Sequence, residues 1–253
     1  MKKYLLVLVV AVMLLVKAPA QKCVPDPGFW ADFKIAVGQE EINLSIFRST
    51  DGTITGNCRF IKDVKNVFAI TGAEENCSYH LNMLNAKKEL RGEFTFQYLV
   101  DKVKKTELYN GIYIDSSNKQ VAVQPKLASM VGGSDTQRYL ELSGTTAEVE
   151  AFAEKIKWAF INNDKKWLAA NCRYPVPYAG FKKTLKTEKD FLDNYDKLFS
   201  KNYRDRFKKI KCYNMFSNHM GALMGAGEVR INNAANTAKE KNRYCISGFD
   251  LLQ

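Results

Sequence analysis

The sequence predicts an α+β fold in two domains, an antiparallel all-β domain over residues 21–142 and an α+β domain over residues 143–253. Up to about Val123, short runs of alternating apolar and polar residues are separated by Gly, Asn and Asp, which is typical of antiparallel strands. Beyond residue 143, apolar residues recur at helical spacing behind capping residues. Without residues 1–20, the chain of 253 residues is still long enough for two domains.

Residues 1–20 have the features of a cleavable signal peptide. Two lysines near the start precede an uncharged apolar run from Leu5 to Val16, which is shorter than the roughly 20 residues that span a bilayer. The small residues at Ala18 and Ala20 fit a signal-peptidase site. We therefore expect a mature protein that begins at Gln21, is periplasmic or secreted, and keeps no integral membrane segment after cleavage.

The net charge is unevenly distributed along the chain. The 38 basic and 27 acidic residues give a formal net charge of +11. Residues 143–253 hold 20 basic and 12 acidic residues, whereas residues 21–142 hold 15 of each. Outside the cytoplasm such a field favours a small-molecule or anionic envelope ligand rather than nucleic acid. The alternative is a solvated lysine-rich surface, because the lysines never form a block of like charge.

The N-terminal elements are predicted as strands. They are expected near residues 33–37, 42–46, 54–60, 67–70, 77–83, 92–99, 108–114 and 120–123. Asp51-Gly52 is the strongest hairpin signal, and Asn110-Gly111 predicts a further break. About eight strands without a helix between them predict an antiparallel meander that closes into a small barrel or sandwich.

Four stretches of this region carry a resemblance to known proteins. They are "ITGNCRF", "VFAITG", "LRGEFTF" and "LYNGIYI", within residues 54–123. In this order they resemble a β-rich module of exported Bacteroides-group proteins. The resemblance implies a lineage and no chemistry.

The C-terminal elements are predicted as helices followed by strands. Thr145 and Glu148 have capping-box spacing, and the helix behind them has a buried face of Val149, Phe152, Ala153, Ile156, Ala159 and Phe160. A short helix is expected over Asp164–Asn171, and Thr187 with Asp190 opens a third. Strands are expected over Lys209–Ser217, Leu223–Ile231 and Arg243–Leu251.

Residues 146–253 resemble the nuclear transport factor two-like, or cystatin-like, fold family, which includes ketosteroid isomerase and the polyketide cyclases. The matching stretches are "VEAFAEKIKWAFINNDKKWLAANCRYPV", "KTEKDFLDNYDKLF" and "HMGALMGAGEVRIN". The resemblance implies a cone-shaped α+β domain with helices packed on a curved antiparallel sheet. It implies no single activity, because the fold holds enzymes, binding modules and dimerisation domains.

Catalytic and metal motifs give no candidate. The two histidines, His80 and His219, fall in different domains, and no glycine-rich phosphate loop occurs. We therefore expect no catalytic residue, metal ligand or cofactor. The resemblance instead suggests a ligand pocket at the cone mouth, lined by Trp158, Tyr174, Tyr178, Tyr195, Tyr213, Glu228 and Arg230. The alternative is that the aromatic residues fill the core and the Glu-Arg pair lies on the surface.

Three functions remain open at this point. The favoured one is a non-enzymatic binding or assembly module with a possible small-ligand pocket in the cone. An isomerase or cyclase-type enzyme acting on a small apolar molecule is the second. The third is a purely structural protein that forms a homodimer.

The six cysteines fall three in each domain. The strands that hold Cys58 and Cys77 are expected to flank a third strand, which puts them about 9.6 Å apart, beyond the reach of a disulfide. The same argument separates Cys212 from Cys245. We expect neither pair to form, and any disulfide to use Cys23 or Cys172. Buried free thiols are equally compatible with the sequence.

Overall fold

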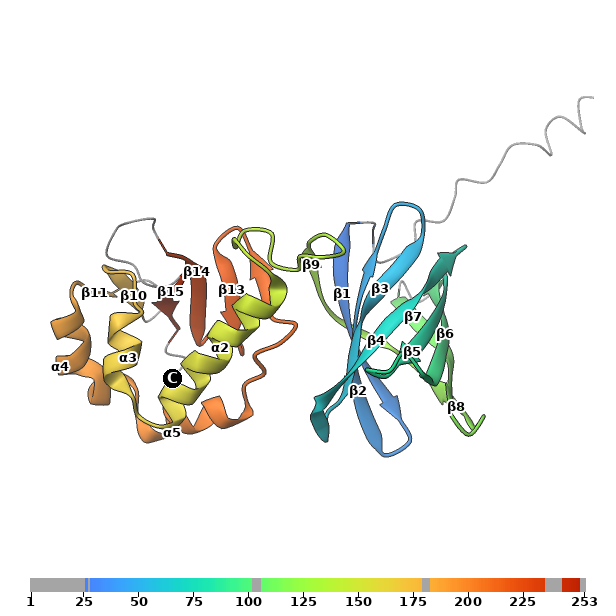
Figure 1. The fold of residues 1–253 in the computed structure, drawn as a ribbon, viewed down its shortest axis with the longest axis horizontal. Coiled ribbons are helices and arrows are strands. Elements are labelled where there is room, and N and C mark those ends of the chain that lie inside the picture. The colour runs from blue at the N-terminus through green and yellow to red at the C-terminus, as the bar shows by residue number, and fades with distance from the viewer. Residues whose placement is uncertain (1–25, 27, 102–105, 179–182, 235–242, 251–253) are drawn as a thin grey trace, which may run out of the picture.

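The computed structural model describes residues 26, 28–101, 106–178, 183–234 and 243–250. The expected signal peptide, the new terminus at Gln21 and Cys23 lie outside these residues. The described chain forms a large sheet of nine strands, followed by helices that pack with a small sheet of four strands (Figure 1). A coarse α+β architecture rich in antiparallel strands is therefore confirmed.

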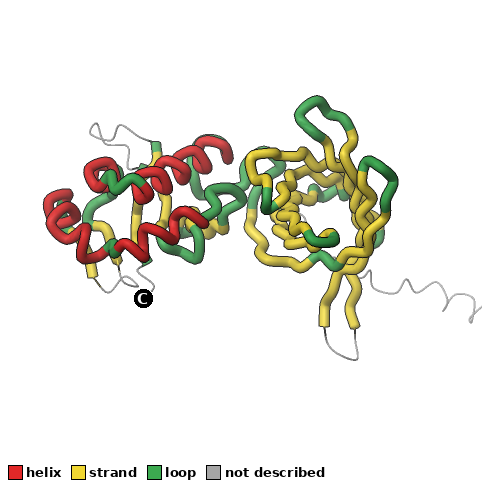
Figure 2. The backbone as a smooth tube through the Cα atoms, turned by 90° about the horizontal axis from the view of Figure 1, so that it is seen from below, coloured by secondary structure: helices red, strands yellow, loops and turns green. Residues whose placement is uncertain are grey.

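The large sheet is an antiparallel meander that curls on itself (Figure 2). Its strands follow one another from β8 back to β1, with β9 on the other side of β1. They are β1 Phe29–Val37, β2 Glu40–Arg48, β3 Thr53–Phe60, β4 Asp63–Glu75, β5 Ser78–Leu84, β6 Leu90–Asp101, β7 Thr106–Asp115, β8 Gln120–Val123 and β9 Lys126–Gly132. The meander was predicted, but β9 was missed and β4 is longer than expected.

The break expected at Asn110-Gly111 is wrong, because both residues lie inside β7. Gly111 is opposite Phe96 of β6. A Cβ atom at Gly111 would lie 2.1 Å from the carbonyl oxygen of Thr95. The glycine therefore serves a close approach of two backbones rather than a turn.

The interior of the curled sheet is filled by side chains. Tyr79 and Phe96 stack with their ring centroids 4.9 Å apart, and Phe33 meets Tyr109 edge to face at 5.0 Å. The other large aromatic residues of this buried cluster are Phe94, Tyr98 and Tyr113. Aromatic contacts of this kind add to the stabilisation from apolar burial.

One segment closes the large sheet by pairing with both of its ends. β8 pairs with β7, and β9, which follows after Gln124 and Pro125, pairs with β1. Both strands are antiparallel to their partners, so the segment keeps one direction while it changes partner. Proline has no backbone N–H for a sheet hydrogen bond, so the change of partner falls where pairing is already interrupted.

In the part of the chain that the structure describes, four α-helices and a 3₁₀ turn follow the large sheet. They are α2 Thr146–Ile161, α3 Lys165–Ala170, α4 Glu188–Leu198, α5 Lys201–Arg206 and η1 Phe207–Lys209. The predicted capping box of Thr145 and Glu148 is present, and the predicted buried face of α2 is confirmed residue for residue. Thr187 caps α4 as predicted, whereas α5 was not predicted.

The small sheet has the order β12-β13-β14-β15. Its strands are β12 Phe216–Asn218, β13 Gly221–Met224, β14 Val229–Asn233 and β15 Tyr244–Phe249, and a separate pair is formed by β10 Val176–Tyr178 and β11 Lys183–Leu185. The single strand expected over Leu223–Ile231 is wrong. Gly225 and Gly227 take positive φ angles there and form the turn of a hairpin.

The strand expected over Lys209–Ser217 is also wrong for most of its length. Only Phe216 and Ser217 belong to a strand, and the preceding residues lie between η1 and β12. Apolar residues at alternate positions, such as Ile210 and Cys212, are buried there without pairing as a strand. The alternation of apolar residues predicted correctly which side chains are buried, but it wrongly predicted strand hydrogen bonds for this segment.

The helices and the small sheet share one hydrophobic core, separate from that of the large sheet. Phe160 of α2 stacks on Phe207 with centroids 4.0 Å apart. Tyr139 and Leu142 also belong to this core, although the expected boundary at residue 142 assigned them to the first domain. We call residues 134–250 the helix-containing part.

None of the described helices has the length and apolar character needed to cross a lipid bilayer.

Candidate functional site

The seven residues expected to line a pocket are spread over the helix-containing part. Trp158 is on the outer face of α2 with 58% of its surface exposed, whereas Tyr195 is fully buried in the core. Tyr174 and Tyr178 are partly buried against the same core. The Tyr174 hydroxyl donates to the carbonyl of Ala169 at 2.9 Å.

The other three residues have separate surroundings. Glu228 is buried at the turn before β14, where its carboxylate accepts a hydrogen bond from the backbone N–H of Ala226 at 2.7 Å. Arg230 lies on β14, 3.1 Å from the sulfur of Met220. Tyr213 lies against Arg59 of the large sheet, whose guanidinium is 4.0 Å from the ring centroid. Burial raises the pKa of Tyr195 to about 12, which suits a tyrosine that stays neutral in a core.

Two adjoining clefts lie where the large sheet closes at Pro125. The first has a volume of about 570 Å³ and the second of about 450 Å³. Asn110, Gln124 and Lys126 line both of them, so we treat them together as the seam cleft. Its remaining lining residues are Ala36, Leu108, Tyr109, Gly111, Ala122, Val123, Pro125 and Leu127.

The seam cleft exists because pairing stops on both sides of the proline. The register of β7 with β8 ends at Gly111 opposite Val123. The register of β1 with β9 begins at Lys34 opposite Lys126. Between these pairs the cleft is lined by the amide side chains of Asn110 and Gln124, the ammonium group of Lys126 and several apolar residues. The sequence analysis missed this site, and Pro125, which follows the strand expected over residues 120–123, is the local feature that could have marked it.

Arg138 joins the two parts of the molecule and is only 1% exposed. Its Nη2 atom lies 2.5 Å from the carboxylate of Asp32 in β1, and its Nη1 atom donates to the hydroxyl of Ser45 in β2 at 2.9 Å. On the other side it donates to the backbone carbonyls of Asn214 at 3.2 Å and Met215 at 3.1 Å. The N–H groups of the guanidinium thus donate to acceptors on both parts of the molecule.

Further polar contacts surround Arg138. Asn57 of β3 and Asn214 exchange two side-chain amide hydrogen bonds, at 2.9 and 3.3 Å. Glu150 of α2 accepts from the backbone N–H of Asn214 at 2.8 Å and from the Tyr139 hydroxyl at 3.1 Å. Burial raises the pKa of the Glu150 carboxyl, although these hydrogen bonds oppose the shift. We call Asp32, Ser45, Asn57, Arg138, Glu150 and Asn214 the junction.

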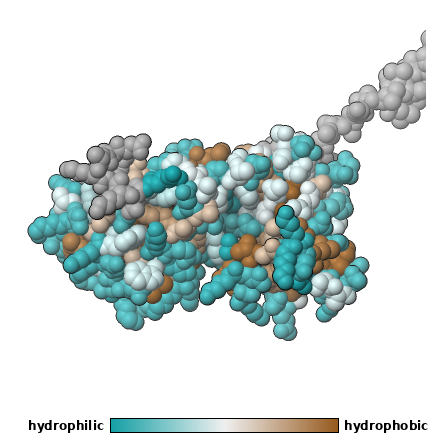
Figure 3. Space-filling model, in the orientation of Figure 1, coloured by the Kyte–Doolittle hydropathy of each residue, from teal (hydrophilic) through white to brown (hydrophobic). Residues whose placement is uncertain are grey.

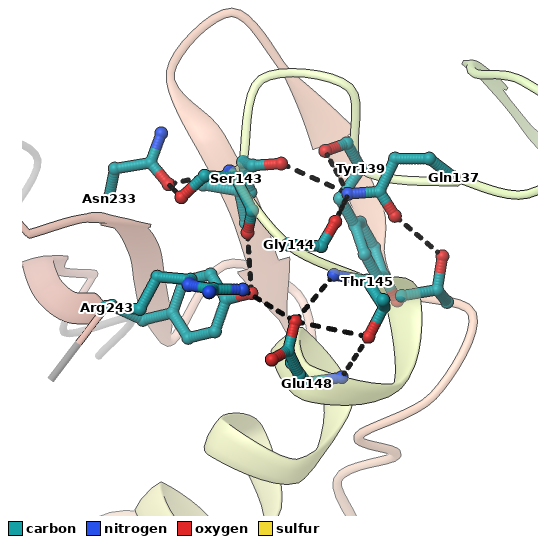
Figure 4. Close-up of polar contacts among 11 residues, drawn as sticks. Gln137, Tyr139, Ser143, Gly144, Thr145, Glu148, Asn233 and Arg243 are labelled. Carbon is teal, nitrogen blue, oxygen red and sulfur yellow. Dashed lines mark hydrogen bonds and ion pairs between the residues drawn. The ribbon is translucent and has the colours of Figure 1, made fainter.

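The loop that presents Arg138 is tied down by its own side chains (Figure 4). The amide nitrogen of Gln137 donates to the carbonyl oxygens of Leu142 at 3.1 Å and Gly144 at 2.6 Å. The Ser143 backbone and hydroxyl both donate to the side chain of Asn233. The segment is a hydrogen-bonded loop, and its polar residues are the ones that order it.

A second anchor of this loop involves α2. The carboxylate of Glu148 accepts from the backbone N–H of Thr145 at 2.7 Å and forms an ion pair with Arg243 at 2.8 Å (Figure 4). The Tyr244 hydroxyl donates to the carbonyl of Ser143 at 2.6 Å. The capping box, read from the sequence as a helix start, therefore also connects the loop to the start of β15.

Both disulfides that the sequence analysis excluded are absent from the described residues. Cys58, Cys172, Cys212 and Cys245 have free thiols, so neither Cys58–Cys77 nor Cys212–Cys245 forms. Cys77 is disulfide-bonded. Cys212 lies outside any strand, and Cys77 lies in the turn before β5, so the strand-spacing argument was wrong in detail for both pairs although its outcome is right.

Among the described residues, no group of three or more His, Cys, Asp and Glu side chains is placed to hold a metal ion. The chain matches no family model, no curated protein and no solved structure.

Proposed function

We propose that this is an exported, non-enzymatic binding protein of two domains, in which the junction holds the domains in one fixed arrangement. The observation that carries the proposal is Arg138, a buried arginine whose hydrogen bonds are divided between the two parts. A buried charge is expensive to desolvate, so its four hydrogen bonds favour this arrangement over others in which the guanidinium would lose partners.

A fixed arrangement makes surfaces that cross both domains usable for recognition. The seam cleft lies on the large sheet beside the face that carries the junction, since Lys126 lines the cleft and sits in the strand next to Asp32 of β1. The amide, ammonium and apolar groups of this cleft form a mixture that is typical of sites that bind small ligands. The proposed ligand site is therefore the seam cleft, and the cone of the second domain serves as a packed support.

Calorimetry of the full protein tests the proposal. If the junction couples the domains, the unchanged protein should unfold in one transition, and Arg138→Ala should separate it into two. Two resolved transitions in the unchanged protein would contradict the coupling. For the exported location, we expect N-terminal sequencing of protein from its native host to start at Gln21, and retention of Met1 would contradict export.

A further inference from the structure

Four side chains form a row across the outer face of the large sheet. Lys126, Lys34, Asn43 and Arg59 are direct cross-strand partners in β9, β1, β2 and β3. Phe33, next to Lys34 in the strand, is buried in the core, so the alternation of side chains puts the row on the outside. Directly opposed residues have Cβ atoms roughly 5 Å apart, so neighbouring cations in this row are close.

The helix-containing part adds another cation to the row. The Lys211 ammonium donates to the side-chain oxygen of Asn43 at 3.0 Å, and Asn43 is the cross-strand neighbour of Lys34. Two residues later, the ring of Tyr213 lies against Arg59. Partial burial and, to a lesser degree, the charge of Lys34 lower the pKa of Lys211, in keeping with two ammonium groups near each other.

Lys34, Lys126 and Lys211 form no ion pair in the part of the chain that the structure describes. Every ion pair found there involves other residues. Glu41 acts on Lys211 only as the weakest of three influences on its pKa. Like charges directly opposed in a sheet are destabilising, and here two lysines are paired in register with a third drawn in from the other domain. An anion bound among them would remove this repulsion.

We propose that Lys34, Lys126 and Lys211, the lysine cluster, bind the phosphate group of a ligand whose remaining part lies in the seam cleft. Lys126 belongs to both, because it lines the cleft and pairs with Lys34. Ammonium groups bind phosphate as point charges, and a phosphate has enough oxygens to meet three of them. The inference rests on the proposed binding function and gives it a ligand class.

Titration calorimetry of the full protein with inorganic pyrophosphate at low ionic strength tests the proposal. A second arm measures cosedimentation with vesicles of phosphatidylglycerol against vesicles of phosphatidylcholine. We expect saturable binding that each of Lys34→Gln, Lys126→Gln and Lys211→Gln weakens about five-fold. Lys87→Gln and Lys155→Gln remove the same charge from exposed sites elsewhere on the two domains and should change affinity less than two-fold.

The two arms identify the source of the phosphate. Lysine-cluster-dependent binding of pyrophosphate indicates a soluble ligand, and such binding to phosphatidylglycerol vesicles alone indicates a lipid headgroup. Three outcomes would overturn the proposal: binding in neither arm, an equal loss of affinity in the control variants, or unchanged affinity in the variant that carries all three replacements of the lysine cluster. Lys34→Gln and Lys126→Gln relieve the repulsion of a directly opposed pair, so the thermal stability of these two variants should be unchanged or higher. None of these results depends on the calorimetric transitions that test the junction.

Discussion

Arg138 and Asp32 lie 106 positions apart in the chain, yet their side chains are joined by an ion pair of 2.5 Å. Asp32 also accepts from the Ser129 hydroxyl, so β9, β1 and the loop before α2 meet at one carboxylate. Only 1% of the arginine side chain and 16% of the aspartate side chain are exposed. Removing one partner of such a pair leaves the other charge buried and uncompensated.

Arg138→Ala should therefore lower the free energy of unfolding by about 3 kcal/mol. Asp32→Ala should cost less when Arg138 is already absent, which a double-mutant cycle measured by urea denaturation would show. Arg91→Ala is the control, because its ion pair with Glu89 is half exposed and should contribute less than about 1 kcal/mol. Additive effects of the two junction substitutions would contradict a direct interaction.

Glu150 predicts a pH dependence of stability. Its folded pKa is raised by burial, so the unfolded chain ionises first as the pH rises. Stability is then lost from about pH 4.3, the ordinary carboxyl value, up through the folded pKa. Glu150→Gln keeps the accepting oxygen and removes the charge, so the variant should lose less stability between pH 4.5 and 7 than the unchanged protein.

The exposed Glu75 gives the matched control for this comparison. Urea denaturation at the two pH values, applied to Glu150→Gln and Glu75→Gln, separates the buried carboxyl from the general effect of one charge. If the two variants showed the same pH dependence, the shift at Glu150 would have no consequence for folding.

Gly111→Ala should destabilise the large sheet by about 2 kcal/mol, because its Cβ would press on the backbone of Thr95 and Phe96. Gly132→Ala is the control in β9, since a Cβ there has no heavy atom within 4 Å. Chemical denaturation of both variants measures the difference. Equal stability of the two would show that β6 and β7 do not approach this closely.

Two thiols should be protected in the native protein. Burial raises the pKa of Cys58 and of Cys212 to about 12, so their reactive thiolate forms are scarce at pH 8. Iodoacetamide should therefore modify both only after denaturation, as judged by mass spectrometry of their peptides. Rapid modification in the folded protein would place these cysteines at the surface.

Cys77 should be recovered in a disulfide by non-reducing peptide mapping. The other described cysteines are free thiols, and Cys23, which lies outside the described residues, is the one that remains of six. We therefore expect a cross-linked peptide that joins Cys23 to Cys77, which agrees with an oxidising compartment. A bridge from Cys77 to Cys58 would contradict the strand order β3-β4-β5.

Local patterns in the sequence predicted α2, α3, α4 and most strands of the meander. Thr145, Glu148 and the buried face of α2 were predictable because capping and helical spacing act within a few residues. Sequence patterns were misleading where a residue's burial or turn preference does not match the hydrogen bonding of its backbone. Ile210 and Cys212 alternate like a strand but only pack, and Gly111 suits a turn but lies in a strand.

Only the tertiary structure decided which distant residues meet. The sequence by itself placed Pro125 after a strand, but the change of partner from β7 to β1 depends on the curling of the whole sheet. Likewise, nothing near Arg138 indicates Asp32 or Asn214 as its partners. Patterns within one element record its own buried face, whereas a contact between elements depends on register and closure, which are set by all the strands together.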